Sequence, residues 1–256
     1  NHVRLTSATA RKYGLDVLLI IRGNKPERFY GNLLLNYLYG AEMAFYDVDA
    51  EDAERIVKER AKDLKNKGRN PYIIPLGGAC PVGVLGYVDA AFEIVSQALS
   101  RKVKVDYIVH STGSGATQAG LILGLKLAGY NAEVVGISCG DPKERIKRSV
   151  WKLIEDTKKM LNVDVNISYD DIIIFDEYTC GGYGAITREV VDAIKYVCRT
   201  EGLLLDPLYT AKAFIGLMSL VKEGYIPKES NVIFIHTGGT PLVFQFGEAL
   251  QAFGSV

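Results

Sequence analysis

The chain has 256 residues, 48% of them hydrophobic, and its 30 lysines and arginines balance its 30 aspartates and glutamates. This length can bury one large core or two modest ones, so we expect one or two domains. The neutral charge balance disfavours nucleic acid and an anionic membrane as partners, because both select a basic surface. No apolar run approaches the roughly 20 residues of a membrane-spanning helix, and the start of the chain lacks the basic-then-apolar order of a signal peptide.

The cysteines and histidines indicate neither a disulfide framework nor a metal site. The four cysteines are far apart and form no CxxC pair, so we expect reduced thiols in a cytoplasmic protein. None of the three histidines has a second histidine four residues away, which disfavours a histidine-based metal site.

Short apolar segments alternate with longer amphipathic segments along the whole chain. The predicted strands are 16–21, 43–48, 72–76, 105–110, 133–138, 171–175 and 231–236. The predicted helices are 3–14, 30–39, 51–66, 87–100, 116–129, 142–161, 186–201, 209–223 and 241–253. Nearly continuous apolar strands separated by helices are typical of parallel sheets covered on both faces. The predicted fold class is therefore α/β.

Local signals mark several helix ends and one domain boundary. Asp141-Pro142 and Asp206-Pro207 each offer a helix N-cap followed by a proline at the first helical position. Gly40 and Gly129 stand where two helices should end. The Gly- and Pro-rich segment 75–83 indicates a boundary near 76–87; the alternative is a long loop inside one domain.

The sharpest local feature is Ser111-Thr112-Gly113-Ser114-Gly115-Ala116-Thr117-Gln118-Ala119-Gly120, which follows a predicted strand and opens a predicted helix. Small residues allow a tight turn in which successive N–H groups point at one anion, and the helix N-terminus adds a partial positive charge. Because this segment lies at the carboxyl end of a parallel strand, we interpret it as a phosphate-binding loop.

The identity of the phosphate is not fixed by this loop alone. A P-loop requires a Gly-Lys-Ser/Thr sequence, and no lysine occurs in the segment. The dinucleotide-binding pattern requires a glycine or alanine where Gln118 stands, and an acidic residue where Ser138-Cys139 ends the next strand. The alternative is a tight strand-to-helix turn that binds no ligand.

Three further segments carry groups suited to chemistry: His236–Pro241 after an apolar strand, Asp206–Lys212 at a predicted helix start, and Gly181–Gly184. The first would lie at the same edge of the sheet as the phosphate-binding loop. The glycines around Tyr183 leave its ring accessible, and Tyr209 stands in the first turn of its helix. Alone, each tyrosine is more often structural than catalytic, since the chain has 15 of them. His236 alone is more often a core residue with satisfied hydrogen bonds.

Together these segments resemble one enzyme family. The resemblance rests, in chain order, on Asn1-His2-Val3-Arg4, Gly31–Leu35, Pro75–Gly78, Gly83–Tyr87, Thr112–Gly120, Asp206–Lys212 and Thr237–Pro241. It is to the 1-aminocyclopropane-1-carboxylate (ACC) deaminases and D-cysteine desulfhydrases, which depend on pyridoxal 5'-phosphate (PLP). The resemblance implies a two-domain, three-layer αβα architecture with mostly parallel sheets, the tryptophan-synthase β-like fold. The domains would be a smaller one, 1–86, and a larger PLP-binding one, 87–256.

The resemblance also implies roles for residues at matching positions. Thr112–Thr117 should bind the PLP phosphate, Asn1 the 3-hydroxyl oxygen of the ring, and Thr237 the pyridine nitrogen. Tyr183 and Tyr209 correspond to the two active-site tyrosines, which contact the substrate and take part in catalysis, and His2 helps to place the substrate carboxylate. A homodimer is expected on the same ground.

The family's catalytic lysine is expected upstream of residue 1. In the family it lies in an N-terminal Gly-Asn-Lys segment, before a serine that precedes the residue matching Asn1. We therefore expect that the chain lacks its N-terminal segment and, without that lysine, does not turn over substrate. Lys212 is interpreted as an ordinary solvated or stem-packed lysine rather than as a replacement.

The substrate prediction depends on the residue after Tyr209. In both chemistries PLP withdraws electrons from the substrate; D-cysteine loses sulfide and ammonia to give pyruvate, whereas ACC must have its ring opened to give 2-oxobutyrate and ammonia. A tyrosine whose pKa is lowered by the cofactor's charge could act as base or nucleophile. ACC deaminases have a glutamate partner for the pyridine nitrogen where this chain has Thr210. A hydroxyl at Thr210 or Thr237 carries no charge, which favours D-cysteine.

ACC remains the alternative substrate. Two other classes also remain: a different PLP lyase of the same fold, such as a serine or threonine dehydratase, and a non-enzymatic α/β protein that binds a phosphoanion. The paired tyrosines disfavour the dehydratase, and PLP absorbance would distinguish the non-enzymatic protein.

Overall fold

The computed structural model describes residues 1–253, which divide into two compact units, Asn1–Gly77 and a second that begins at Gly78. The first unit contains a two-stranded parallel sheet of β1 and β2. Leu18 lies opposite Glu42 at one end of the pairing, and Arg22 lies opposite Tyr46 at the other. The elements of this unit are α1 (His2–Lys12), β1 (Leu18–Arg22), α2 (Gly31–Leu38), β2 (Glu42–Tyr46) and α3 (Ala50–Asn66). The Asp49 side chain accepts a hydrogen bond from Asp52 N at 2.9 Å and so caps α3.

The second unit contains a four-stranded sheet in the order β5-β4-β3-β6, and every pair of neighbours is parallel. The 3-10 helix η1 (Leu76–Gly78) spans the point where the two units divide. The elements of the second unit are α4 (Pro81–Arg101), β3 (Tyr107–Thr112), α5 (Ala116–Leu127), β4 (Glu133–Ser138), α6 (Lys143–Leu161), η2 (Tyr169–Asp171), β5 (Ile173–Phe175), α7 (Arg188–Glu201), α8 (Thr210–Lys222), β6 (Val232–Phe234), α9 (Pro241–Gln245) and α10 (Gly247–Ala252). The predicted α/β class with parallel sheets is confirmed.

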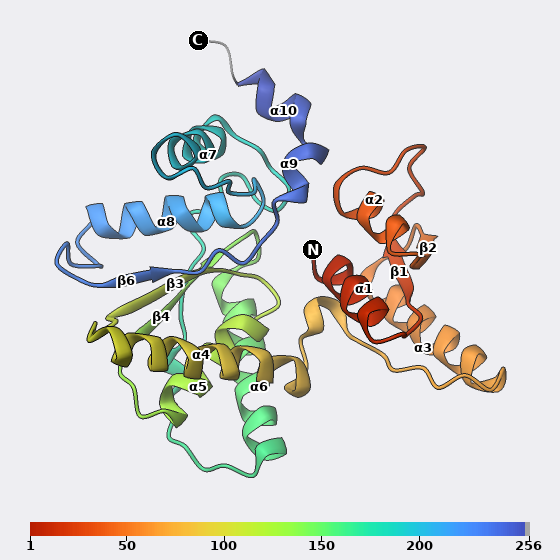
Figure 1. The fold of residues 1–256 in the computed structure, drawn as a ribbon, viewed down its shortest axis with the longest axis horizontal. Helices are drawn as coiled ribbons and strands as arrows, with labels where there is room; N and C mark the ends of the chain where they lie inside the picture. The colour runs from red at the N-terminus through yellow and green to blue at the C-terminus, as the bar shows by residue number, and fades with distance from the viewer. Residues whose placement is uncertain (254–256) are drawn as a thin grey trace. The chain divides into compact units, whose positions relative to one another are not determined.

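Helices cover both faces of this sheet (Figure 1). Successive strand residues point to opposite faces. Ile108 belongs to the core formed with α4, α5 and α6, whereas Val109 packs in the core that includes Ala213 of α8. The sheet is therefore buried on both sides, which explains why its strands are nearly continuous apolar runs in the sequence.

Two glycines let α5 lie close to α4. A Cβ at Gly120 would lie 2.6 Å from the Val84 carbonyl oxygen, and one at Gly124 would lie 2.7 Å from the Val88 carbonyl oxygen. Any larger residue would push the helices apart. Because α5 begins directly after the loop that follows β3, this packing also fixes the position of that loop.

The helix α4 is long and apolar enough, by length and composition, to cross a membrane, which the sequence analysis did not expect. Core helices of other proteins meet the same criterion. Val84, Val88, Ala91 and Val95 of α4 are buried, at the three- and four-residue spacing of one helix face. That face contributes to the core shared with α5 and α6.

Three predicted elements differ in the structure. Segment 72–76 forms no strand, since Pro71 precedes it and Pro75 lies within it, and proline lacks the N–H donor that a strand ladder needs. The predicted helix 241–253 is two helices that meet at Phe246. Asp141 does not cap α6; Asp176 does, by accepting a hydrogen bond from Lys143 N at 2.7 Å.

The two units divide between Gly77 and Gly78, whereas the sequence placed the domain boundary after residue 86. The reason for the difference is that α4 begins at Pro81 and continues without a break through residue 86 to Arg101.

Candidate active site

The loop between β3 and α5 has the conformation expected of an anion-binding turn. Thr112 ends β3, and Gly115 is the N-cap of α5 with a φ of 92°, a value that L-residues with side chains rarely adopt. A Cβ at Gly115 would lie 2.9 Å from Val150 Cγ2 of α6, and one at Gly113 would lie 3.1 Å from Cys139 Sγ. The backbone of this loop is therefore packed directly against its neighbours.

Unpaired polar groups in this loop fit a phosphate. The Thr112 hydroxyl, at the end of β3, is buried and, within residues 1–253, has no hydrogen-bond partner. The first N–H groups of α5 have no partner within the helix, and the helix dipole adds partial positive charge there. An acceptor with several oxygens would satisfy these donors, and the phosphate of PLP is such a group.

Two buried polar side chains lie next to this loop. Gln118 Nε2 donates to the carbonyl oxygen of Ile173 at 2.7 Å, which ties α5 to β5. The ring of His110 is completely buried, its Nδ1 lies 2.8 Å from the Ser111 carbonyl oxygen, and its Nε2 has no partner among the described residues. Burial lowers the pKa of His110 to about 4, so the ring is neutral near pH 7.

The loop after β6 lies at the same edge of the sheet, because β6 and β3 are parallel neighbours. His236 is exposed rather than in the core: its Nδ1 accepts from Gly238 N at 3.2 Å, which leaves Nε2 to donate to the Leu204 carbonyl oxygen at 2.9 Å. Gly239 has a φ of 98°, and a Cβ there would lie 2.5 Å from Asp206 Cγ. The loop that contains Thr237 is thus packed against Asp206.

Asp206 organises the start of α8. Its completely buried carboxylate accepts hydrogen bonds from the N–H groups of Leu208, Tyr209 and Thr210 at 2.8–2.9 Å. The Thr210 hydroxyl donates to Asp206 Oδ1 at 2.8 Å and accepts from Asp206 N at 2.7 Å. The single proton of that hydroxyl is therefore used by Asp206, so Thr210 cannot donate to a ring nitrogen in this arrangement.

The structure brings the two predicted tyrosines into contact. The hydroxyl oxygens of Tyr183 and Tyr209 are 2.7 Å apart, and their rings meet edge to face with centroids 6.1 Å apart. Tyr183 is 64% exposed, as its glycine neighbours predicted, and Tyr209 is half-buried. Burial and the hydrogen bond with Tyr183 raise the pKa of Tyr209, which is opposite to the lowering expected from a cofactor charge.

Cys139 connects the loop after β3 with the tyrosines. Its Sγ lies next to Gly113, and its carbonyl oxygen accepts a hydrogen bond from Lys212 Nζ at 3.4 Å. The next residue, Gly140, touches the backbone of Tyr183: a Cβ there would lie 2.6 Å from Tyr183 N. Burial raises the pKa of the Cys139 thiol to about 11, so it is a packing group rather than a nucleophile.

Asn1 and His2 belong to the first unit. Asn1 Oδ1 accepts from Asn32 Nδ2 at 2.8 Å, and His2 is the first residue of α1. Burial lowers the pKa of His2. The roles implied for both residues stay predictions.

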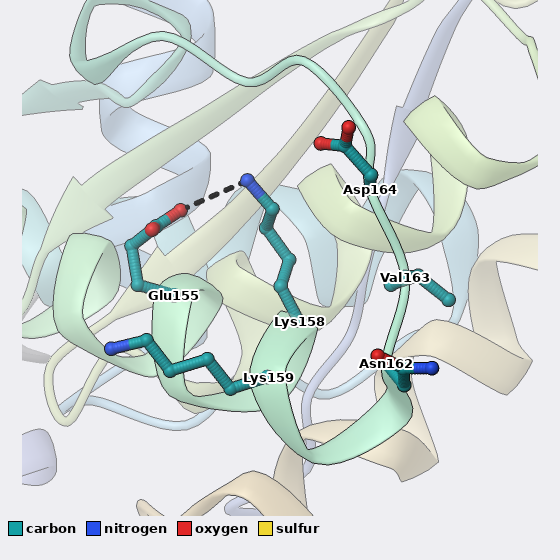
Figure 2. Close-up of a pocket in the computed structure, with 6 residues that line it drawn as sticks. All are labelled: Glu155, Lys158, Lys159, Asn162, Val163 and Asp164. Carbon is teal, nitrogen blue, oxygen red and sulfur yellow. Dashed lines mark hydrogen bonds and ion pairs between the residues drawn. The ribbon is translucent and has the colours of Figure 1, made fainter.

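A surface hollow lies elsewhere in the second unit (Figure 2). It is lined by Glu155, Lys158, Lys159, Asn162, Val163 and Asp164, with Lys158 Nζ 3.1 Å from Glu155 Oε1. The helix α6 runs from the carboxyl end of β4 toward the amino end of β5, so this hollow lies at the edge of the sheet opposite the loops described above. It contains none of the predicted site residues.

Comparisons with known proteins show the family of this chain. Residues 1–238 match the family described as "Pyridoxal-phosphate dependent enzyme". The chain is 42% identical to the putative ACC deaminase of Pyrococcus abyssi, over 98% of this chain and 74% of that protein. It is 32% identical to the ACC deaminase of a Bradyrhizobium species, over 95% of this chain and 74% of that protein. A crystal structure of an ACC deaminase homologue superposes with a TM-score of 0.90 at 40% identity, over 99% of this chain and 75% of that one.

The fold and the matching family model define a PLP-dependent enzyme with the tryptophan-synthase β-like fold. Within that class, the chain belongs to the ACC deaminase family, as its resemblance predicted. PLP is the cofactor of this family.

The sequence analysis missed Lys212 and the packing roles of Cys139 and Gly140. Lys212 lies inside an apolar run, Ala211 to Ile215, which was a signal that it would be buried. Nothing local to Cys139-Gly140 indicated contact with Tyr183, because these segments are far apart in the sequence.

Proposed function

We propose that this protein uses PLP to release ammonia from a small amino acid, and that Thr112–Thr117 binds the cofactor phosphate. The observation that carries the proposal is the buried, unpaired Thr112 hydroxyl beside the free N–H groups at the start of α5. We further propose that Thr237 faces the pyridine nitrogen, that Asn1 binds the ring oxygen, and that His2 helps to place the substrate. In this proposal the cofactor phosphate binds to the second unit, which begins at Gly78.

We propose that the tyrosine pair transfers protons to and from the substrate. PLP, when bound, withdraws electrons from the amino-bearing carbon of the substrate. Because the two phenol oxygens are 2.7 Å apart, one hydroxyl donates to the other, and the outer one can exchange a proton with a substrate atom. The raised pKa of Tyr209 makes it a weaker acid, so we propose that the exposed Tyr183 hydroxyl exchanges the proton with the substrate and that Tyr209 supports it through the hydrogen bond between them.

ACC is the first substrate to test. Relatives at 42% and 32% identity bear the name ACC deaminase, which favours ACC over the D-cysteine that the sequence analysis put first. ACC has no hydrogen on its amino-bearing carbon, so its ring must be opened at another carbon, and a pair of phenols in contact suits that proton transfer.

D-cysteine is the second candidate, and Thr210 favours it. A carboxylate at position 210 would hold a proton on the pyridine nitrogen. In this chain the residue is a threonine, and its hydroxyl is hydrogen-bonded to Asp206. An uncharged partner for the nitrogen weakens electron withdrawal. Loss of a thiolate from D-cysteine requires less electron withdrawal than opening the ring of ACC, so a threonine at position 210 supports β-elimination.

One assay decides between the substrates. Protein expressed from its complete coding sequence and loaded with PLP is supplied with ACC or with D-cysteine, and 2-oxobutyrate and sulfide are measured. Faster release of 2-oxobutyrate supports ACC, and faster release of sulfide supports D-cysteine. Turnover of neither, in a protein that shows PLP absorbance, would refute both.

The remaining properties are expectations. We propose that the protein is a cytoplasmic homodimer. We expect it to bind its small amino-acid substrate and to bind neither nucleic acid nor a membrane. Sedimentation equilibrium of the complete protein tests the dimer, and a monomer at all concentrations would contradict it.

A further inference from the structure

Lys212 is completely buried, with an exposed fraction of 0%, although the sequence analysis expected a solvated or stem-packed lysine. No ion pair among residues 1–253 includes Lys212. Its Nζ donates instead to two backbone carbonyl oxygens, that of Gly182 at 2.6 Å and that of Cys139 at 3.4 Å. Burial lowers the pKa of Lys212. Burying an ammonium group without a carboxylate partner is costly. The two carbonyl oxygens that Lys212 binds therefore indicate which segments of the backbone it positions.

Both acceptors adjoin Tyr183. Gly182 directly precedes Tyr183, and Cys139 directly precedes Gly140, on which the Tyr183 backbone lies. The loop has positive φ angles at Cys180, Gly181, Gly182 and Gly184. Such a loop has no regular ladder to hold it, so the hydrogen bond from Lys212 is one of the few contacts that fix where Tyr183 lies.

Tyr209 and Lys212 lie in the same turn at the start of α8. One rigid element therefore positions both ends of the tyrosine contact: it carries Tyr209 itself, and through Lys212 it holds the loop of Tyr183. The contacts form a closed ring, from Tyr209 through α8 to Lys212, to Gly182, to Tyr183 and back through the 2.7 Å contact between the hydroxyls.

We propose that Lys212 is a positioning residue, which sets the Tyr183 hydroxyl against the Tyr209 hydroxyl by binding the Gly182 carbonyl oxygen. This inference rests on the proposed function of the tyrosine pair. A purely structural lysine would contribute to folding without affecting the contact between the phenols, so the two roles are separable.

The first test measures turnover. Lys212→Met keeps an unbranched side chain that is one atom shorter and removes its donors, and Lys222→Met is the matched control at an exposed lysine on the same helix. In the complete, PLP-loaded protein, Lys212→Met should lower kcat by about 100-fold, because a displacement of about 1 Å at reacting groups has that effect. PLP affinity and KM should change less than about threefold. Unchanged kcat in Lys212→Met would overturn the proposal.

The second test needs no turnover. Tyrosines are replaced by 3-fluorotyrosine, and the ¹⁹F resonances of Tyr183 and Tyr209 are assigned by their loss in the Phe variants. With Lys212 present, Tyr183→Phe should shift the Tyr209 resonance; with Met at that position, the shift should disappear. A shift of undiminished size in Lys212→Met would overturn the proposal. Should the wild-type protein turn over neither substrate while the phenols remain coupled through Lys212, the proposed function fails and the positioning role stands.

A third variant covers the case in which Lys212→Met does not fold. Lys212→Arg keeps the charge and the donors, so the coupling between the two phenol resonances should survive and kcat should stay within about tenfold of wild type. A folded Lys212→Arg protein without that coupling would overturn the proposal.

Discussion

The loop between β3 and α5 and the Tyr183–Tyr209 pair lie at the same edge of the second unit but are built in different ways. The loop is contiguous, consists of backbone and small residues, and is held by glycines packed against α6 and Cys139. The pair joins two side chains from distant segments and is held by a ring of hydrogen bonds through Lys212. In the proposed function, cofactor binding thus depends on a short local motif, and proton transfer depends on tertiary contacts.

The largest expected effect is that of Tyr209→Phe. Removal of a hydroxyl that acts in proton transfer should lower kcat by about 1,000-fold, while the absorbance of bound PLP stays, because the β3–α5 loop is untouched. Steady-state kinetics and absorbance spectra of the complete protein measure both. The matched control is Tyr196→Phe at an exposed tyrosine of α7, which should keep full activity. Equal activities in the two variants would remove Tyr209 from the mechanism.

The next largest effect is that of Gly115→Ala. An alanine there must adopt a φ near 92° and approach Val150 Cγ2 to 2.9 Å, so the free energy of unfolding should fall by about 3 kcal/mol and PLP should bind about 100-fold more weakly. The control is Gly129→Ala, where φ is also positive but no atom lies within 4 Å; it should cost about 1 kcal/mol. Urea unfolding and PLP titration measure these changes. Equal costs at the two glycines would contradict the close packing.

A smaller effect is expected for Thr112→Val, which keeps the shape of the side chain and removes its unpaired hydroxyl. Loss of one hydrogen bond to a charged phosphate should weaken PLP binding by about tenfold to thirtyfold. Thr112→Ser, which keeps the hydroxyl, should bind within about threefold of wild type. Equal affinities of the Val and Ser variants would show that this hydroxyl does not contact the phosphate.

The smallest effect is expected for Ser149→Ala. Ser149 Oγ donates to the Ser114 carbonyl oxygen at 3.4 Å in an exposed position, and such a long, exposed hydrogen bond contributes less than about 0.5 kcal/mol. PLP affinity should change less than about twofold in a titration. A tenfold loss would mean that side-chain contacts, rather than packed backbone, hold the loop.

The same contrast explains what the sequence could reveal. The β3–α5 loop was predictable because its glycines and hydroxyls are consecutive and follow an apolar strand. The sequence Asp206-Pro207 predicted that Asp206 binds N–H groups near a helix start, although α8 begins three residues after Pro207. Segment 72–76 was apolar enough for a strand, but Pro71 before it and Pro75 within it prevent pairing.

Side-chain partners across the fold were not predictable. The burial of Lys212 depends on the carbonyl oxygens of Gly182 and Cys139, which are 30 and 73 residues away in sequence. The use of the Thr210 hydroxyl by Asp206 likewise depends on the turn that precedes α8. No periodicity or local motif encodes such contacts.

The most direct test of the central claim is hydrogen–deuterium exchange of the complete protein with and without PLP. We predict that the amides of Gly113–Thr117 show the strongest slowing of exchange on PLP binding, and that Thr112→Val reduces that slowing. Bound PLP that slows exchange elsewhere but leaves these amides unchanged would contradict the assignment of this loop to the cofactor phosphate.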